Sequence, residues 1–234
     1  MMKPYYQDDA VTIYHGDCRE IVPQLGRFDL LLTDPPYGIK HESSHVADTT
    51  TAAWMRSQIY GDEDTSMRDC ALAWNAEWCV FASIKAPPPV GWRGCMVWDK
   101  GEAAGMGDLS FPWKPNWELI FAAGNHWTGR RDTGVLRGPT MVTRASMGRK
   151  HPHEKPVWLI AQILAKHTAE IVLDPFAGSG TTGRAAKDLG RKATLIEREE
   201  RYCEIAASRM AQEVLPLDYR DNTEGQTRGG SRVV

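Results

Sequence analysis

The chain has 234 residues, which is enough for one or two domains, and a single α/β domain of this size buries a sizeable core. Hydrophobic residues make up 42% and charged residues 25%, a composition that argues against global disorder. The net charge of −2 leaves no basic excess over the whole chain, and the five cysteines include no C-x-x-C pair, which excludes a zinc ribbon.

Two features of the sequence indicate a cytoplasmic protein. No apolar run approaches the length of a membrane span, and the first residues, MMKPYYQDDAV, are too polar for a signal peptide. An odd number of cysteines also suits a reducing compartment better than a disulfide framework. We therefore expect a cytoplasmic location.

Short apolar runs alternate with helical patterns along the chain, which is typical of a mainly parallel α/β sheet. Strands are expected at 11–14, 28–33, 78–83, 94–99, 117–122, 170–174 and 193–197. Helices are expected at 17–25, 66–76, 154–167, 180–189 and 198–213. The pattern predicts a single domain over residues 1–215.

Three segments lack periodicity. Residues 38–65 are polar and long for a connection, which indicates a mobile loop inserted in the domain. Within the second insertion, 123–150, residues 129–150 carry a charge of +5, so they can bind a polyanion although the rest of the chain is acidic. The alternative is a solvated loop. Residues 216–234 read as a flexible tail.

A glycine-rich turn follows the expected strand at 170–174. Its glycines at 178, 180 and 183 match G-x-G-x-x-G, and Glu197 ends the next strand 19 residues after the first of them. This is the pattern of a dinucleotide-binding turn, in which the acidic residue binds ribose hydroxyl groups. A nicotinamide-dependent oxidoreductase is therefore one interpretation.

Asp174 stands where the nicotinamide pattern has its first glycine. A carboxylate there would repel a pyrophosphate but attract a ligand that carries an ammonium or sulfonium group. S-adenosylmethionine has both groups, together with a ribose for Glu197. A structural turn that binds nothing is the remaining alternative.

The expected strand 28–33 ends in a stiff turn, Asp34-Pro35-Pro36-Tyr37. Consecutive prolines fix φ and extend the residue before each of them. The Asp34 carboxylate and the Pro35 carbonyl can accept both N–H groups of an exocyclic amine, while Tyr37 offers an aromatic face to a planar base. Such a turn would aim the nitrogen lone pair without any covalent intermediate. As an isolated motif, it also occurs as an ordinary turn.

Together, the two turns resemble the S-adenosylmethionine-dependent DNA methyltransferases that act on adenine N6 or cytosine N4. Residues 34–37 resemble the family's catalytic motif, and residues 174–181 resemble its methyl-donor motif. The catalytic motif comes first and the basic segment lies between the two, as in the circularly permuted β class. The stretch from His151 to Pro156 resembles the family's H-x-x-x-K-P, and the resemblance covers roughly residues 11–210.

The resemblance implies roles for individual residues. The expected catalytic residues are Asp34, Pro35, Pro36 and Tyr37. The residues expected to bind the donor are Asp17, Lys155, Asp174, Pro175, Phe176, Gly178, Ser179, Gly180, Thr181 and Glu197. Asp17 followed by Glu20 also fits a helix capping box. The residues expected to contact DNA are Arg130, Arg131, Arg137, Arg144, Arg149 and Lys150.

The implied fold is a Rossmann-like sheet of seven strands in the order 3-2-1-4-5-7-6, with strand 7 antiparallel. The motifs assign 170–174, 193–197, 11–14 and 28–33 to strands 1 to 4 of that order. No metal is expected, since His151 and His153 lack a third ligand at suitable spacing.

The implied function is site-specific methylation of double-stranded DNA at a flipped base, as in restriction-modification enzymes, which are often dimers. Adenine N6 is favoured because cytosine-N4 members more often have serine where this chain has Asp34. The alternatives are a cytosine-N4 methyltransferase, the oxidoreductase, and a DNA-binding module without catalysis.

Overall fold

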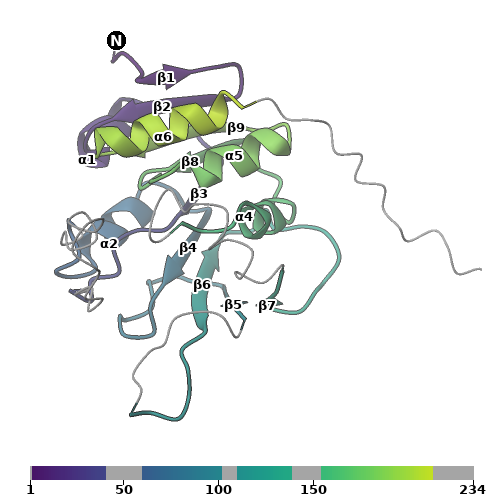
Figure 1. The fold of residues 1–234 in the computed structure, drawn as a ribbon. Coiled ribbons are helices and arrows are strands. Elements are labelled where there is room, and N and C mark those ends of the chain that lie inside the picture. The colour runs from purple at the N-terminus through teal and green to yellow at the C-terminus, as the bar shows by residue number, and fades with distance from the viewer. Residues whose placement is uncertain (1, 41–59, 102–109, 139–153, 213–234) are drawn as a thin grey trace, which may run out of the picture.

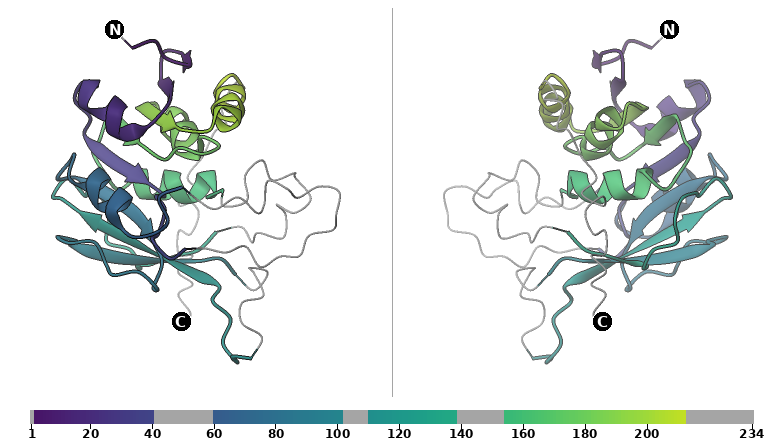
Figure 2. Two further views of the ribbon diagram at one scale, coloured as in Figure 1. Left: turned by 90° about the vertical axis from the view of Figure 1, so that its left-hand side faces the viewer. Right: turned by 90° about the vertical axis from the view of Figure 1, so that its right-hand side faces the viewer.

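The computed structural model describes residues 2–40, 60–101, 110–138 and 154–212. They form one twisted sheet between two layers of helices (Figures 1 and 2). Helices α4 (Val157–Leu164), α5 (Thr181–Asp188) and α6 (Glu200–Met210) cover one face. Helices α1 (Cys18–Ile21) and α2 (Ser66–Leu72) cover the other, and a short 3-10 helix, η1 (Val22–Gln24), continues α1. None of the helices in these ranges could cross a membrane.

The sheet has nine strands in the described ranges. From one edge to the other they are β1 (Tyr6–Gln7), β2 (Val11–His15), β9 (Lys192–Glu197), β8 (Ile171–Asp174), β3 (Leu30–Thr33), β4 (Trp78–Ala82), β6 (Trp117–Ala123), β5 (Gly94–Asp99) and β7 (Val135–Leu136). At the centre, Leu31 of β3 pairs with Leu173 of β8 and with Trp78 of β4, both in parallel.

Strand β6 is antiparallel to both of its neighbours, β4 and β5. From β2 to β5 the sheet follows the order 3-2-1-4-5-7-6, with β6 as strand 7. The expected number of seven strands is wrong, because β1 and β7 extend the two edges. Each has only two residues, too few to produce an alternating pattern in the sequence.

The expected helices exist but are shorter than predicted. Helix α4 begins at Val157 instead of residue 154, because Pro156 is its extended N-cap and Lys155 precedes a proline. The segment at 17–25 is divided, since Pro23 lies in the 3-10 helix that follows Ile21. The expected loop at 38–65, the segment at 123–150 and the tail at 216–234 lie wholly or partly outside the described residues.

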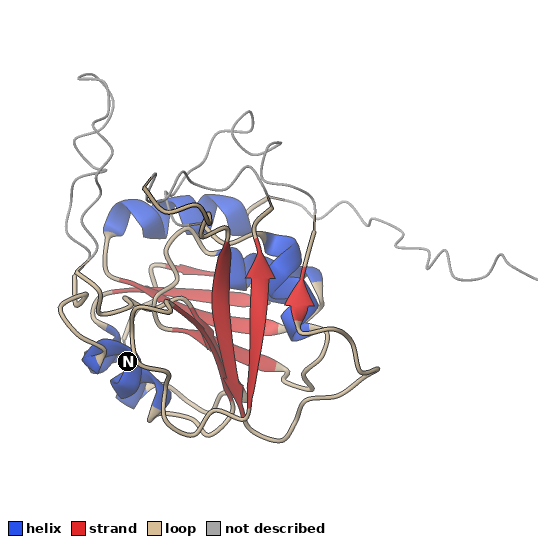
Figure 3. Ribbon diagram, turned by 90° about the horizontal axis from the view of Figure 1, so that it is seen from below, coloured by secondary structure: helices blue, strands red, loops and turns tan. Residues whose placement is uncertain are grey.

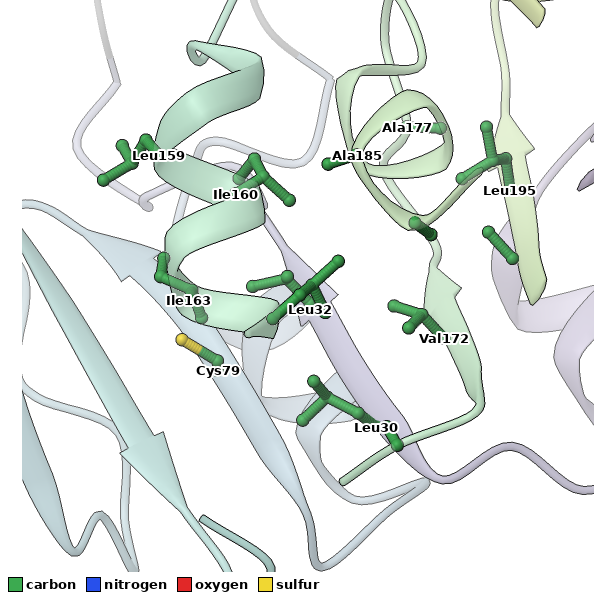
Figure 4. Close-up of a cluster of buried hydrophobic side chains, with 14 of the residues drawn as sticks. Leu30, Leu32, Cys79, Leu159, Ile160, Ile163, Val172, Ala177, Ala185 and Leu195 are labelled. Carbon is green, nitrogen blue, oxygen red and sulfur yellow. The ribbon is translucent and has the colours of Figure 1, made fainter. Parts of the chain in front are cut away.

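Alternate residues of the central strands β3 and β8 point to opposite helical layers, so these strands are apolar up to their last residues, Thr33 and Asp174. Leu30 and Leu32 of β3 belong to the cluster under α4 and α5, whereas Leu31 faces α1 and α2. Figure 4 shows the first cluster, in which Ile160 and Ile163 of α4 lie over the strands. Figure 3 shows the helices on either side of the sheet.

The strand ends define two further edges of the sheet, which run across the strands and differ from the outer strands β1 and β7. We call the one where β2, β9, β8, β3 and β4 end the carboxyl edge, and the one where they begin the amino edge.

At the amino edge, Glu77 holds together the turn after β6 and the end of α4. Its carboxylate accepts the backbone N–H of Asn125 at 2.9 Å and lies 2.9 Å from His126 Nδ1 and 3.2 Å from His167 Nε2. Although burial alone would raise it, these partners lower the pKa of Glu77 to about 2.

The tautomer of His167 follows from its contacts. Its Nδ1 accepts the backbone N–H of Ala169 at 3.0 Å, so Nε2 carries the proton and donates to Glu77. Burial lowers the pKa of His167, which favours this neutral form. At neutral pH Glu77 is therefore ionised and His167 is neutral, as their contacts require, and acid disrupts the cluster by protonating them.

Glu77→Gln should lower the melting temperature at pH 7 by roughly 5 °C, because the ionised carboxylate is the form that its partners stabilise. A depressed folded-state pKa contributes stability above the unfolded value and loses it as pH falls through the folded one. The difference from wild type should therefore shrink from pH 4.5 downward in thermal melts. Glu204→Gln, at an exposed position on α6, is the control. A difference that stays constant with pH would contradict this electrostatic role.

Candidate active site

The two turns singled out by the sequence leave adjacent strands at the carboxyl edge. Strands β3 and β8 are parallel neighbours, so Asp34, which follows Thr33, and Asp174 lie at the same end of the sheet. The Thr33 hydroxyl group donates a hydrogen bond to Asp174 Oδ1 at 2.6 Å. One buried contact therefore joins two turns whose first residues, Asp34 and Asp174, are 140 positions apart in the chain.

The Asp34 carboxylate is held on both oxygens. The Tyr37 hydroxyl donates to Oδ1 at 2.6 Å, and the Lys155 ammonium group lies 2.6 Å from Oδ2. Lys155 also donates to the Tyr37 hydroxyl oxygen at 3.2 Å. Burial, and then the charges of Asp34 and Glu118, raise the pKa of Tyr37 well above its usual value, so Tyr37 remains a donor. The turn thus holds its carboxylate in a fixed orientation.

A second anchor lies just beyond this turn. The Gly38 N–H donates to the buried Asp62 carboxylate at 2.7 Å, and Gly38 has a φ of 72°. A Cβ atom at Gly38 would lie 2.3 Å from the backbone carbon of Asp64, so only glycine fits. The sequence analysis placed Asp62 in a polar insertion and missed this anchoring role.

Asp174 is a buried carboxylate with only 3% exposure. Burial raises its pKa to about 6, although hydrogen bonds from Thr182, Thr33 and the Phe176 N–H oppose the shift, and the charge of Asp34 adds to it. The Phe176 N–H lies 3.1 Å from Oδ1. Asp174 forms no ion pair with any residue in the described ranges, and a buried negative charge of this kind fits a site for a positively charged ligand.

Glu197 ends the neighbouring strand β9 and binds the glycine turn. Its Oε2 accepts the Gly178 N–H and its Oε1 accepts the Glu199 N–H, both at 2.8 Å. Burial raises the pKa of Glu197. A carboxylate has about four acceptor positions, so it can still bind hydroxyl groups of a ligand.

The other residues of the glycine turn serve the packing of the fold. A Cβ atom at Gly180, where φ is 78°, would lie 2.8 Å from Ala206 Cβ on α6, and one at Gly183 would lie 2.6 Å from Leu195 Cδ1 on β9. The Thr181 hydroxyl accepts a hydrogen bond from Arg209 at 2.9 Å. These contacts explain Gly180 and Thr181 without a ligand. Pro175 and Ser179 are buried in the same turn.

The ammonium group of Lys155 contacts the Asp34 turn. This lysine is one of the residues expected to bind the donor, and the structure places its ammonium group against Asp34 and Tyr37. Its third partner is Glu118 of β6, whose Oε2 lies 3.2 Å away. Sequence reasoning missed Glu118 and its second partner, Lys100, although an acidic residue inside the apolar strand WELIFAA was a signal.

Asp17 caps helix α1 beside the tip of β9. Its Oδ1 accepts the Arg19 N–H at 2.9 Å, and its Oδ2 lies 2.5 Å from the Arg19 guanidinium group. These hydrogen bonds lower the pKa of Asp17. The neighbouring Gly16 N–H donates to the Glu197 backbone carbonyl at 2.9 Å. The capping role that the sequence offered for Asp17 is therefore present, next to Glu197.

Of the basic residues predicted to contact DNA, the three that the structure describes, Arg130, Arg131 and Arg137, lie at two opposite edges. Strand β6 is antiparallel, so the chain after it begins at the amino edge, where Lys166 binds the Arg130 carbonyl at 2.6 Å. Arg130 and the adjacent Arg131 are therefore far from the Asp34 turn along the strands. Arg137 follows β7 at the carboxyl edge, and its side chain binds Asp99 at 3.0 Å. The others, Arg144, Arg149 and Lys150, lie outside the described residues.

The chain matches known DNA methylases. A family model for DNA methylases, named for N6 and N4 methyltransferases, matches residues 97–208, which include Asp174 and Glu197 but not Asp34. Two type II methyltransferases, M2.LlaDCHI of Lactococcus lactis subsp. cremoris and M2.DpnII of Streptococcus pneumoniae, are each 25% identical to this chain. The alignments cover 90% and 91% of this chain and 93% and 94% of theirs.

Solved structures show the same fold. A crystal structure of an M1.HpyAVI–SAM complex is 24% identical, with a TM-score of 0.57 over 85% of this chain and 99% of that one. PvuII DNA methyltransferase, which is cytosine-N4-specific, is 18% identical, with a TM-score of 0.59 over 90% of this chain and 89% of that one.

Asp174→Asn should raise the melting temperature at pH 8 by about 5 °C, because wild type must ionise a buried carboxyl there. The folded-state pKa of about 6 exceeds the usual value of 3.8, so this penalty shrinks as pH falls from 6 and is gone only below 3.8. Thermal melts between pH 4 and 8 therefore measure it. A variant less stable than wild type at pH 8 would contradict the assignment.

Proposed function

We propose that this chain, which matches the N6-adenine and N4-cytosine DNA methylases, methylates adenine N6 in double-stranded DNA, with S-adenosylmethionine as donor. One observation carries the proposal. The Asp34 turn and the Asp174 turn leave adjacent strand tips and are joined by the 2.6 Å hydrogen bond from Thr33 to Asp174. A group held by one turn can therefore meet a group held by the other.

The residues of the second turn fit the donor. The buried Asp174 carboxylate suits the ammonium and sulfonium charges, and Glu197 has acceptor positions left for the ribose hydroxyl groups. Phe176 and Gly178 line the same turn. When bound, S-adenosylmethionine supplies a methyl group as an electrophile, with its sulfonium as the leaving group.

The first turn would hold the target amine. The amine is paired and stacked inside a duplex, so the base must leave the helix before it can react. The Asp34 carboxylate and the Pro35 carbonyl then accept its two N–H groups, and the Tyr37 ring packs against the base. The nitrogen forms its bond to the methyl carbon and afterwards loses a proton. Pro35 and Pro36 keep these acceptors fixed, so the rate gain comes from orientation.

Adenine is favoured over cytosine by Asp34 itself, since the family's cytosine-N4 members more often have serine there. The family match gives no support to a nicotinamide-dependent oxidoreductase. A module that binds DNA without catalysis is the second alternative, and a labelling experiment distinguishes it.

Asp34→Ala should reduce methyl transfer at least a thousandfold, because the variant lacks the carboxylate that orients the amine. Transfer of a tritiated methyl group to unmethylated DNA, followed by nucleoside analysis, measures both the rate and the modified base. S-adenosylhomocysteine should bind the variant as it binds wild type in calorimetry, and NAD should bind neither. Asp9→Ala, at an exposed position, is the control.

Three results would refute parts of this proposal. Undiminished turnover by Asp34→Ala would remove the catalytic assignment. Label in N4-methylcytosine would replace adenine by cytosine. DNA binding by wild type without any labelling would support the inactive module.

The cysteines support a reducing compartment, and we propose a cytoplasmic location. All five are free, and burial raises the pKa of Cys18 and Cys203 to about 12, which keeps these thiols protonated.

We propose that DNA contacts the connection between β5 and β6. Strand β5 ends and β6 begins at the carboxyl edge, and Asp99 pairs with Trp117 at the base of this connection. Phe111 is 61% exposed and Trp113 is 75% exposed on it. In Figure 1 the described part of this connection that leads into β6, residues 110–116, extends below the sheet. Exposed aromatic rings next to a flipped base can stack on neighbouring bases or fill the space that the base leaves.

Trp113→Ala should weaken binding of a fluorescent duplex about tenfold in anisotropy titrations, because one stacking contact is lost. Binding of S-adenosylhomocysteine should not change. Trp92→Ala is the matched control, since Trp92 is 46% exposed but packs with a tilted ring against Phe121 near the amino edge. Equal losses of DNA affinity in the two variants would contradict the proposed contact.

A further inference from the structure

Glu118 is an acidic side chain that the proposed function leaves without a role. It is the second residue of β6, and because β6 is antiparallel, it lies at the carboxyl edge with the Asp34 turn. Its side chain is 18% exposed. Oε1 accepts a hydrogen bond from Lys100 at 2.7 Å. Oε2 is buried, lies 3.2 Å from Lys155 Nζ, and accepts no hydrogen bond of good geometry from the residues that the structure describes.

Lys155 is shared between two carboxylates. Its residue exposure is 8%, and its ammonium group lies 2.6 Å from Asp34 Oδ2, 3.2 Å from Glu118 Oε2 and 5.0 Å from the centre of the Phe81 ring. Burial alone would lower the pKa of Lys155, but the charges of Asp34 and Glu118 outweigh burial and raise it. Both carboxylates therefore keep this lysine charged.

The four groups form a chain of alternating charge, Lys100, Glu118, Lys155 and Asp34. The chain is neutral as a whole. Without the charge of Glu118 it would carry a net positive charge, and Lys155 would interact with Asp34 alone. Both effects oppose methyl transfer. The amine nitrogen becomes positive as its new bond forms, so a net positive charge nearby repels it. The nitrogen also needs the Asp34 carboxylate as acceptor, and Lys155 would compete for that carboxylate.

We infer that Glu118 is a positioning residue for the methyl transfer: it holds and neutralises Lys155, so that Asp34 keeps its orientation and its attraction for the target amine. The inference rests on the proposed function. Glu118 acts through Lys155 and has no contact with the reacting atoms in this account.

Glu118→Gln should lower kcat at least tenfold, which corresponds to the loss of roughly one charge-assisted contact. The KM for DNA and the affinity for S-adenosylhomocysteine should both stay within twofold of the wild-type values. Neutral Lys155 would no longer hold Asp34 in its orientation, so loss of its proton should set the alkaline limb of the kcat profile. That limb should move to lower pH in Glu118→Gln, because Lys155 loses one of the two charges that raise its pKa. Glu118→Asp should retain more kcat than Glu118→Gln, although glutamine matches the native size better. Glu204→Gln is the control.

A kcat within twofold of wild type and an unmoved alkaline limb would overturn the inference. So would greater activity in Glu118→Gln than in Glu118→Asp, because size and not charge would then matter. If wild type methylates no DNA, the proposed function is wrong. Crystal structures of wild type and Glu118→Gln then test separately whether Glu118 positions Lys155 and Asp34. A displaced Lys155 or Asp34 side chain in the variant supports the positioning role, and unchanged positions overturn it.

Discussion

The hydrogen bond from Thr33 to Asp174 joins the tips of the two central strands, and the rest of the site depends on this adjacency. Parallel pairing of β3 and β8 places the stiff proline turn next to the glycine turn. Two further strands contribute at the same edge: β9, beside β8, with Glu197, and β6, which lies beyond β4, with Glu118. A sheet with a different strand order would separate these groups, so the chemistry follows from the topology.

The same edge concentrates buried charge, which folding alone would not favour. Asp174 has a raised pKa because it is buried without a cation, and Lys155 stays charged only because two carboxylates face it. Arrangements that cost stability in this way are typical of sites that bind charged ligands. By contrast, the Glu77 cluster at the amino edge has its partners in place and stabilises the fold.

The sequence predicted the central strands and both turns because each carries a strong local pattern. It did not predict β1 or β7, which are too short, or the exact start of α4, which Pro156 determines. The sequence also did not predict contacts between distant segments. The ion pair of Lys155 with Glu118 and the hydrogen bond from Gly38 to Asp62 join residues that share no local motif. Arg130 lies at the amino edge because β6 is antiparallel. The basic segment itself carries no signal of that strand direction, so the sequence did not predict this position.

The most direct test of the central claim is a crystal structure with an S-adenosylmethionine analogue that carries an amine in place of the methyl sulfonium. We expect the ribose at Glu197 and the amine beside Asp174, pointing toward the Asp34 carboxylate between the tips of β8 and β3. An analogue bound with its amine directed away from Asp34, or bound at the amino edge, would contradict the account.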